Sequence, residues 1–369
     1  MKTSLYRSVV ACGLVLAALL ASLGVAAAAE LTDLNDRKVR VPDQVRKISI
    51  DDGRFLVALS LIQPDPVQWL AAWPRDVHRV GEASYAQYVA RFPALRSVPQ
   101  VASSAGSFNL EAVLAAAPDV AVVSVGAGPS QAQAAQLQAA GIPVVFIDFF
   151  DNPFRNQEPS LRILGQLTGG QAKAEAFIAL RRAHLDRIAQ RVAQLAPTAR
   201  PTVFLEAHAG MTGDCCNSPG KGNMGEYIAF VGGHNIGADV LKAPTGKLNI
   251  EYVMSRDPQV YIATGGAHLE KSGGLVLGAG YDAARARASL AAVTQRQGIA
   301  QLSAVKSGRS FGLAHQLINS PIDIVAIEAF ATWIHPELFQ DVDPAKTLAE
   351  INRRFLAVPY QGAGWTALQ

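Results

Sequence analysis

Cysteine and long apolar stretches are both scarce in this chain. Only 3 of the 369 residues are cysteines, while half of the residues are hydrophobic, so large cores can form without disulfide support. No segment after residue 30 is long and uncharged enough to cross a bilayer. The sequence also has no run of basic residues, and its formal net charge is only +3, so we expect no nucleic-acid partner.

The motifs of common hydrolases and nucleotide-binding proteins are missing as well. The chain has neither a Gly-x-Ser-x-Gly nucleophile elbow nor a His-Glu-x-x-His zinc helix. Gly-Lys at 220–221 lacks the first glycine and the following Ser or Thr of a phosphate-binding loop, and Gly-Ala-Gly at 126–128 lacks the third glycine of a dinucleotide site. We therefore expect no enzyme. The alternative is an exported hydrolase that uses Cys215 with a histidine.

The N-terminus has the pattern of a secretory signal peptide. Two basic residues precede an apolar run from Val9 to Leu23, and alanines before Glu30 form a small-residue cleavage site. We expect a cleaved signal over residues 1–29 and a periplasmic location. The segment that ends at Cys12 faintly resembles a lipoprotein cleavage box, but the apolar run before it is too short for an anchor.

One pattern occurs twice in the chain, at 107–126 (SFNLEAVLAAAPDVAVVSVG) and at 247–266 (KLNIEYVMSRDPQVYIATGG). Each copy begins with an asparagine that can cap a helix, and an acidic residue follows in the first turn. An apolar stripe then leads through a proline into a β-branched strand. Two copies of one αβ unit predict two similar lobes that face each other across a ligand-binding cleft.

Strand-like and helical runs alternate along the chain, which predicts an α/β fold with mainly parallel sheets. The expected strands are Lys47–Ile50, Val120–Val123, Val144–Ile147, Thr202–Leu205, Val260–Ala263 and Ser310–Leu313. The expected helices are Phe55–Leu61, Leu110–Ala116, Gln131–Ala140, Gly225–Val231, Ile250–Arg256 and Ile322–Ile334.

A long helical stretch separates the two halves of the chain. Leu161–Leu167 and then Gln171–Leu195 have helical patterns, and the second is about as long as a domain is wide. We predict an N-terminal α/β lobe over 30–160, a connecting helix over 161–196 and a C-terminal α/β lobe over 197–369. The alternative is a surface helix of one large domain.

The order of several segments resembles a known family. The export signal is followed by LTDLNDRKVRVPDQVRKISI, FNLEAVLAAAPDVAVVS, GIPVVFID, GGHN and LNIEYVMSRDPQVYIATGG. This series resembles the periplasmic substrate-binding proteins of ABC importers for iron–siderophores, haem and cobalamin. The resemblance implies two Rossmann-like lobes joined by one rigid helix, with the ligand between them and only a small closing movement. It also implies an inner-membrane ABC permease as the partner.

The resemblance further places the permease-docking residues at Glu111 and Glu251, one in each repeat. An acidic residue in the first turn of a helix is also stabilised by the helix dipole without any partner, which is the alternative interpretation. We expect a monomer, because one polypeptide supplies both lobes.

Ligands of open α/β sheets bind beyond the carboxyl ends of the strands, so the loops there supply the candidate ligand-binding residues. These candidates are Arg54, Tyr85, Arg155, His208, Cys215, Cys216, Asn217, Lys221, His268, His315 and Asn319. Arg54 can form a forked contact with an oxygen-rich anion or pair with Asp51 or Asp52. Neutral donors with a few cations suit an iron–siderophore, so we predict a ferric chelate as the ligand, with no resident cofactor or metal.

The histidines and the paired cysteines leave other ligands open. His208, His268 and His315 each follow a predicted strand of the second half, and three histidines with an acid would suit zinc or manganese. Their scattered spacing is instead typical of hydrogen-bonding loop residues, and haem, cobalamin and bare metal remain alternatives. Cys215 and Cys216 favour a vicinal disulfide in an oxidising compartment, with two free thiols or a soft metal site as alternatives.

Overall fold

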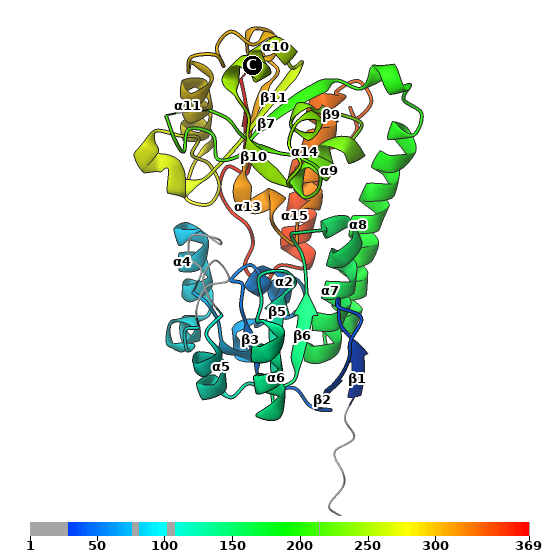
Figure 1. The fold of residues 1–369 in the computed structure, drawn as a ribbon, viewed down its shortest axis with the longest axis vertical. Helices are drawn as coiled ribbons and strands as arrows, with labels where there is room; N and C mark the ends of the chain where they lie inside the picture. The colour runs from blue at the N-terminus through cyan, green and yellow to red at the C-terminus, as the bar shows by residue number, and fades with distance from the viewer. Residues whose placement is uncertain (1–28, 76–80, 102–107, 214, 369) are drawn as a thin grey trace, which may run out of the picture.

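The computed structural model describes residues 29–75, 81–101, 108–213 and 215–368, so the predicted signal segment lies outside it except for its last residue. Two α/β lobes are stacked along the long axis of the molecule, and the long helix α8 (Gln171–Val192) runs beside both (Figure 1). Within the described ranges no helix combines the length and the apolar character that a membrane span requires.

The lower lobe of Figure 1 contains a four-stranded parallel sheet in the order β4-β3-β5-β6. Its central strands are buried on both faces, as expected for parallel strands that helices cover on each side. The strands are β3 (Ile48–Ile50), β4 (Leu70–Ala72), β5 (Val120–Ser124) and β6 (Val144–Ile147). The helices are α2 (Phe55–Ile62), α4 (Glu82–Arg91), α5 (Leu110–Ala116), α6 (Gln131–Ala139) and α7 (Pro153–Thr168), with the short 3-10 helices η1 (Val67–Trp69) and η2 (Pro93–Ser97). An antiparallel hairpin of β1 (Ala29–Thr32) and β2 (Lys38–Val41) precedes them.

The upper lobe contains a five-stranded sheet in the order β13-β12-β11-β7-β9, in which only β13 is antiparallel to its neighbour. The strands are β7 (Thr202–Glu206), β9 (His234–Asn235), β11 (Val260–Gly265), β12 (Ser310–Ala314) and β13 (Trp365–Ala367). The helices are α9 (Met224–Phe230), α10 (Ile250–Arg256), α11 (Ala283–Thr294), α12 (Ser303–Lys306), α13 (His315–Ile318), α14 (Ile324–Ile334) and α15 (Pro344–Arg354), with the 3-10 helices η3 (Pro197–Ala199), η4 (Ile236–Asp239) and η5 (Ala267–Ser272). A separate antiparallel pair joins β8 (Asn217–Pro219) to β10 (Thr245–Lys247).

The predicted repeat is confirmed in both lobes, as α5–β5 and α10–β11. The side chain of Asn109 accepts a hydrogen bond from the Ala112 backbone N–H at 3.0 Å, and that of Asn249 accepts one from the Glu251 N–H at 2.8 Å. Each helix is therefore capped by its asparagine, as the sequence predicts. Each copy then enters its buried strand, so the carboxyl ends of β5 and β11 are placed equivalently in the two lobes.

Two helices between the halves of the chain differ from the predicted ones at one end each. Helix α7 already begins at Pro153, eight residues before the expected start, and α8 ends at Val192 rather than at Leu195. Asn152 caps α7 and a proline occupies its first turn, which is a common way to begin a helix. Between the two helices, Gly169 adopts a left-handed conformation with φ 69°, which glycine reaches without steric cost.

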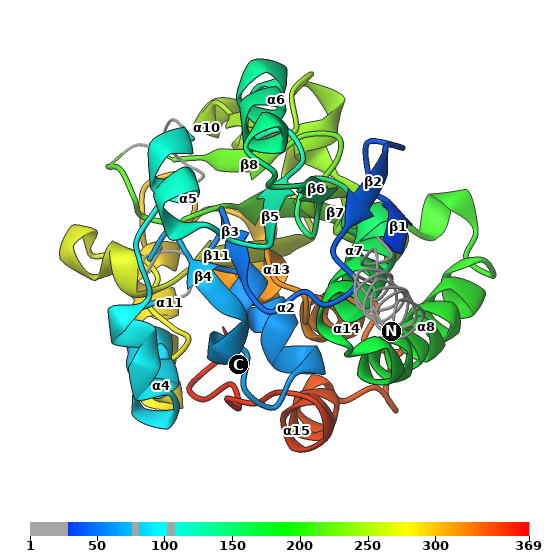
Figure 2. The same cartoon turned by 90° about the horizontal axis from the view of Figure 1, so that it is seen from below.

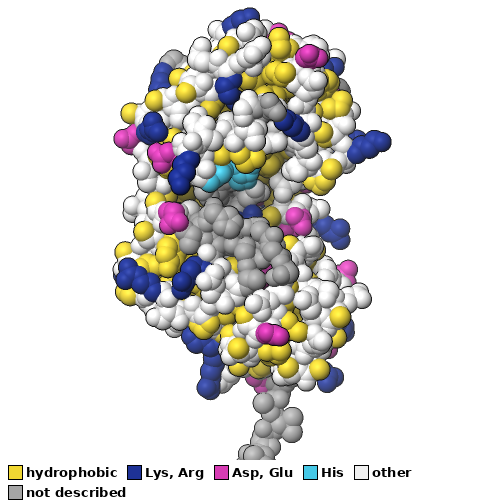
Figure 3. Space-filling model, turned by 60° about the vertical axis from the view of Figure 1, so that its left-hand side comes forward, with side chains coloured by type: hydrophobic (Ala, Val, Ile, Leu, Met, Phe, Trp, Pro, Cys, Tyr) yellow, Lys and Arg dark blue, Asp and Glu magenta, His cyan; other side chains and the backbone are white. Residues whose placement is uncertain are grey.

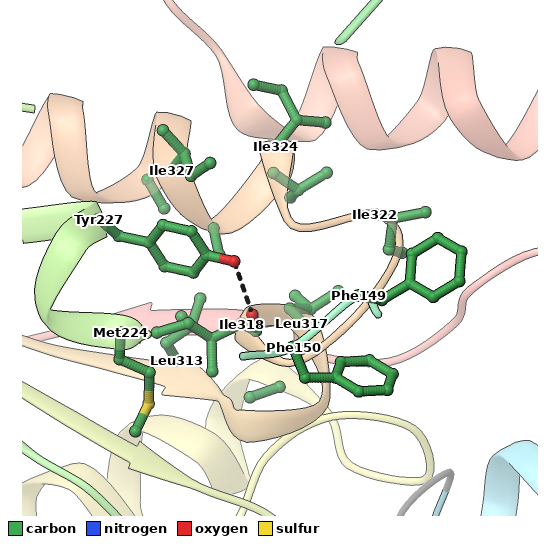
Figure 4. Packing of buried hydrophobic residues seen from close by; sticks show 14 of the residues in the cluster. Phe149, Phe150, Met224, Tyr227, Leu313, Leu317, Ile318, Ile322, Ile324 and Ile327 are labelled. Carbon is green, nitrogen blue, oxygen red and sulfur yellow. Dashed lines mark hydrogen bonds between the residues drawn. The ribbon is translucent and has the colours of Figure 1, made fainter. Parts of the chain in front are cut away.

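The lobes also contact each other away from α8. Phe149 and Phe150, which follow β6, pack against upper-lobe residues such as Leu317 and Ile322 in one apolar cluster (Figure 4). The chain passes between the lobes a second time after α15, where the Ala357 backbone N–H donates to the backbone oxygen of Ser60 in α2 at 3.0 Å. The chain then returns to the upper sheet as β13.

Candidate ligand-binding site

A pocket lies between the lobes at the carboxyl ends of the strands. Three parts of the chain line it: the helices α2 and α4 from below, the α13 region from above, and the segment after α15. The described lining residues are Arg54, Val57, Ser84, Gln87, Tyr88, Gln316, Asn319, Ser320, Ile322, Leu356, Val358, Pro359 and Tyr360. The pocket therefore combines apolar walls with a small set of polar groups, as small-molecule sites usually do.

Arg54 is the cation of this pocket among its described lining residues. Its Nε and Nη2 donate to the two carboxylate oxygens of Asp52 at 3.0 and 2.7 Å, and its guanidinium carbon lies 3.3 Å from the centre of the Phe150 ring. The sequence offered a ligand contact and an aspartate pair as alternatives for Arg54. The structure shows the pair and also places Arg54 at the pocket, so Asp52 and Phe150 fix the orientation of a cation that a ligand can reach.

Tyr360 contributes a buried hydroxyl that has no hydrogen-bond partner among the described residues. Burial raises the pKa of Tyr360, so the hydroxyl keeps its proton. A buried polar group without a partner costs free energy, and a ligand oxygen in the pocket would supply that partner. Gln316 and Asn319 add amide groups on the upper side of the same pocket.

The three histidines predicted in the second half converge beside this pocket. The Nδ1 atom of His208 lies 2.9 Å from the Nε2 atom of His268, and the ring centres of His208 and His315 are 3.9 Å apart. Figure 3 shows histidine side chains at the surface where the upper lobe faces the lower one. They meet because β7, β11 and β12 are adjacent parallel strands, so the residues that follow them share one edge of the sheet.

Burial keeps two of these imidazoles uncharged. Burial, and secondarily the nearby His268, lower the pKa of His208 to about 4. Burial followed by His208, His268 and Arg54 lowers the pKa of His315 well below its usual value. Both ring nitrogens of His315 are engaged, with Nδ1 3.0 Å from Thr264 Oγ1 and Nε2 2.9 Å from Asn319 Nδ2. Asn319 thus joins the histidine cluster to the pocket.

The other predicted candidates lie elsewhere. Tyr85 stacks on Trp73 with ring centres 5.9 Å apart and is not among the described lining residues. Arg155, expected in a loop, is an exposed residue in the first turn of α7, because that helix begins earlier than predicted. Lys221 is exposed in the loop before α9, and Asn217 pairs with Lys247 in the β8–β10 hairpin.

Cys215 and Cys216 form the vicinal disulfide that the sequence favoured. Cys216 is buried, and its backbone oxygen accepts a hydrogen bond from the Leu248 N–H at 2.9 Å. The disulfide therefore lies against the start of α10, and neither cysteine is among the described residues of the pocket between the lobes. With the bridge formed, the described residues contain no free thiol for the hydrolase alternative.

Among the described lining residues of the pocket, only Arg54 and Asn319 were predicted candidates, and α4 and the segment after α15 supply several of the others. Ser84, Gln87 and Tyr88 share one face of α4, and Tyr360 follows α15. The helical spacing of Tyr85, Tyr88 and Val89 could have indicated the helix, but no local signal connects it to the cleft. Tyr360 reaches the pocket only because the chain returns from the lower lobe to form β13.

Asp51, at the end of β3, provides a test of the electrostatics beside the cleft. It is buried, and desolvation raises its pKa to about 7, although Ser124 donates to its carboxylate from N–H and Oγ. A raised carboxyl pKa stabilises the fold below the unfolded pKa, and this stability is lost as the pH rises through about 7. Between pH 4 and pH 8, the free energy of unfolding of the unmodified protein should therefore fall by roughly 2–4 kcal/mol more than that of the Asp51→Asn protein. Urea unfolding across that range measures it, with the exposed Asp43→Asn as control; equal pH slopes for Asp51→Asn and the unmodified protein would contradict the expectation.

Glu111 and Glu251 are both exposed in the first turns of α5 and α10. The two helices belong to different lobes (Figure 1). In the view along the long axis, both lie on the same side of the molecule, away from α8 (Figure 2). The repeat therefore places an exposed acidic residue in the first turn of an equivalent helix in each lobe.

Comparison with known proteins identifies the family. The sequence profile described as "Periplasmic binding protein" matches residues 59–317, more than half of the chain. An uncharacterized ABC transporter substrate-binding lipoprotein, YvrC of Bacillus subtilis (strain 168), is 21% identical over 339 residues, which cover 89% of this chain and 98% of YvrC. A vitamin B12-binding protein of Yersinia pestis (strain Pestoides F) is 30% identical over 172 residues, which are 46% of this chain and 57% of that protein.

The fold matches solved structures as well. The TroA-like periplasmic binding protein FepB from Veillonella parvula superposes with a TM-score of 0.82 at 24% identity, over 92% of this chain and 99% of that one. At this identity the likeness shows the two-lobe fold, and the profile match shows the family. The chain therefore belongs to the periplasmic binding protein family.

Proposed function

We propose that this protein captures a ferric chelate, of the iron–siderophore class, in the pocket between its lobes and delivers it to an ABC permease in the inner membrane. The observation that carries the proposal is the pocket itself, which places a fixed guanidinium and neutral donors opposite each other on the two lobes. The family consists of binding proteins, so we infer capture and release of the ligand without chemical conversion.

The polar groups of the pocket fit a chelate with an oxygen-rich surface. Arg54 can donate to a carboxylate, catecholate or hydroxamate oxygen, and the Tyr360 hydroxyl and the Gln316 and Asn319 amides can donate beside it. The apolar walls, which include Val57 and Ile322, suit the carbon backbone of such a chelate. This chemistry favours an anionic ferric complex, because the Arg54 guanidinium donates charge-assisted hydrogen bonds to anionic oxygens.

Two further properties support export and delivery. The N-terminal sequence has the pattern of a signal peptide, and YvrC is named as a substrate-binding component of an ABC transporter. Glu111 and Glu251, one on each lobe, would dock on basic residues of the permease. A protein that bridges both halves of a transporter with its two lobes can work as a monomer.

Tryptophan-fluorescence titration of the mature protein tests the proposed ligand. Ferric siderophores, haem, cobalamin and free divalent metals are compared at fixed salt. Saturable quenching by a ferric chelate at micromolar or lower concentration is expected. Quenching by haem or cobalamin alone would identify that cofactor as the ligand in place of a ferric chelate. A response only to free metal would contradict the proposal that the ligand is a chelate.

Substitution of Arg54 locates the ligand. Arg54→Gln should weaken binding of the ferric chelate by about 10- to 100-fold, because a charge-assisted hydrogen bond is lost. Arg155→Gln is the matched control, since Arg155 was predicted from the sequence but is exposed on α7. Equal effects of the two substitutions would place the ligand outside this pocket. Thermal unfolding of both variants confirms that they fold.

A further inference from the structure

We propose that the vicinal disulfide is a site of thiol exchange, at which a small thiol bonds to Cys215 and occupies a groove beside Glu251. An occupied groove blocks docking on the permease, so modification of Cys215 regulates delivery of the cargo. The exchange itself depends on neither the ligand nor the permease. Its effect on delivery rests on the proposed function, in which Glu251 contacts the permease.

The bridge contributes little to the stability of the whole chain. A disulfide stabilises a protein mainly by restricting the unfolded chain, and this effect grows with the number of residues that the bridge encloses. Cys215 and Cys216 are adjacent in the sequence, so the bridge encloses none. It therefore constrains only its immediate surroundings, and opening it leaves the cores of both lobes intact.

The two cysteines of the bridge differ in their access to solvent. Cys216 is completely buried and belongs to the hydrophobic core. Cys215 is only partly buried and lines a surface groove. Exchange requires that a thiolate reach a sulfur of the bridge, and exposed disulfides are the ones that exchange readily. The attack is therefore directed to the Cys215 sulfur.

The groove has room for a small thiol. Its volume is about 1100 Å³, at the upper end of the range of about 300–1,000 Å³ for small-molecule sites. Leu248, Ile250 and Met254 give it apolar walls, and Glu251 also lines it. The groove and the pocket between the lobes share no described lining residue. A tripeptide thiol such as glutathione can occupy it without contact with the ligand.

The bridge is connected directly to the helix that carries Glu251. The Cys216 backbone oxygen accepts a hydrogen bond from the Leu248 N–H at 2.9 Å, and the next residue, Asn249, caps α10. The strand after the bridge, β8, pairs with β10, which leads into the same helix. A group bonded to Cys215 therefore lies beside the acidic residue that the proposed function assigns to permease docking.

The exchange balances without a further oxidant or reductant, because one disulfide replaces another. The thiolate attacks Cys215 Sγ, a new S–S bond forms between them, and the bond between Cys215 and Cys216 breaks. The electron pair of the broken bond stays on the Cys216 sulfur, which takes a proton from water. With a dithiol, the second thiolate of the reagent attacks its own sulfur in the mixed disulfide. The reagent is then oxidised to a cyclic disulfide, and Cys215 leaves as a second free thiol.

Glutathione and dithiothreitol test the exchange on untagged mature protein without denaturant. The reaction is stopped with acid, and tandem mass spectrometry locates the adduct. We expect excess glutathione to give an adduct on Cys215 and none on Cys216, and dithiothreitol to open the bridge with a mass gain of two hydrogen atoms. A bridge that reacts only after denaturation, or an adduct on Cys216, would overturn the inference.

Two single substitutions compare the cysteines directly. Cys216→Ser leaves the partly buried sulfur free, whereas Cys215→Ser leaves the buried one. With glutathione disulfide, the Cys216→Ser protein should form the mixed disulfide on the order of 100-fold faster than the Cys215→Ser protein, because the reaction rate depends on thiol access. Thermal unfolding confirms that both variants fold. Equal rates for the two folded variants would contradict the assignment of Cys215 as the exchanging sulfur.

Spheroplasts that contain the permease but lack this protein test the effect on delivery. Purified Cys216→Ser protein is added with or without glutathione on Cys215. The adduct should leave the affinity for the ferric chelate unchanged and lower import more than about tenfold, because it occupies the docking face. The matched control carries the same adduct on Glu175→Cys, in a protein with Cys215→Ser and Cys216→Ser. Since α8 lies on the opposite side from α10 (Figure 2), this control should import normally.

The outcomes distinguish this inference from the proposed function. Normal import by the Cys215 adduct, or an equal loss with the Glu175→Cys adduct, would overturn the regulation of docking. If the protein without any adduct binds the ferric chelate and supports import but its bridge does not exchange, the proposed function stands and the inference fails. If the bridge exchanges as expected but no form of the protein supports import, the exchange site stands and the proposed function fails.

Discussion

A protein with Glu111→Arg and Glu251→Arg is expected to bind its ligand with unchanged affinity and to support no uptake. Both side chains are exposed, so their replacement alters no packing in either lobe, and their helices α5 and α10 lie on one side of the molecule (Figure 2). If the two acids dock on basic groups of a permease, as proposed, reversing both charges converts attraction into repulsion, which costs several kcal/mol across an interface. Loss of the favourable dipole contact costs only about 0.3–1 kcal/mol per helix.

Uptake of the labelled ferric chelate in cells that carry either version in place of the native protein measures this effect. Glu175→Arg with Glu337→Arg is the matched control, because both residues are exposed and the change of net charge is the same. Glu175 lies on α8, on the opposite side from α5 and α10 (Figure 2). Normal import by the Glu111→Arg/Glu251→Arg protein would assign both acids to helix stabilisation alone.

The second large effect concerns stability. Arg181 in α8 donates to both carboxylate oxygens of Asp323 at 2.9 and 2.8 Å, and both side chains are completely buried. The Tyr227 hydroxyl also donates to Asp323, at 3.0 Å. Asp323→Ala should lower the free energy of unfolding by about 3–5 kcal/mol, because it leaves the Arg181 charge buried without its partner.

Urea unfolding of a double-mutant cycle tests the coupling. Arg181→Met should cost a similar amount, whereas Arg181→Met combined with Asp323→Ala should cost much less than the sum, since no buried charge remains. The neighbouring Arg182 is exposed and pairs with Glu158, so Arg182→Ala should cost under about 1 kcal/mol. Additive effects of the two buried substitutions would show that the pair is not coupled.

Much of the fold could be predicted because its central strands are buried on both faces. The strands Val144–Ile147 and Val120–Ser124 are continuous apolar runs bounded by Pro or Gly, and the asparagine caps at Asn109 and Asn249 define the starts of two helices. Such signals are local. Edge elements such as β13 have too few residues to show a strand pattern in the sequence. Their structure depends on pairing with the neighbouring strand.

The candidate site was predictable only where strand ends define it. Arg54 and the three histidines follow strands of parallel sheets, and the topology then places them at the cleft. The expectation that Arg155 lies in a loop was wrong, because the Asn-Pro helix start at 152–153 begins α7 before it. Tyr360 comes from a segment whose course depends on contacts with α2, which no local pattern encodes.

The second passage of the chain between the lobes has a mechanical consequence. Besides the helix α8, the segment that touches Ser60 and the apolar cluster around Phe149 and Phe150 hold the two lobes together. A wide separation of the lobes would have to break the hydrogen bond between Ala357 and Ser60 and expose apolar side chains of that cluster to water. These contacts therefore act as a mechanical restraint on how far the two lobes can move apart.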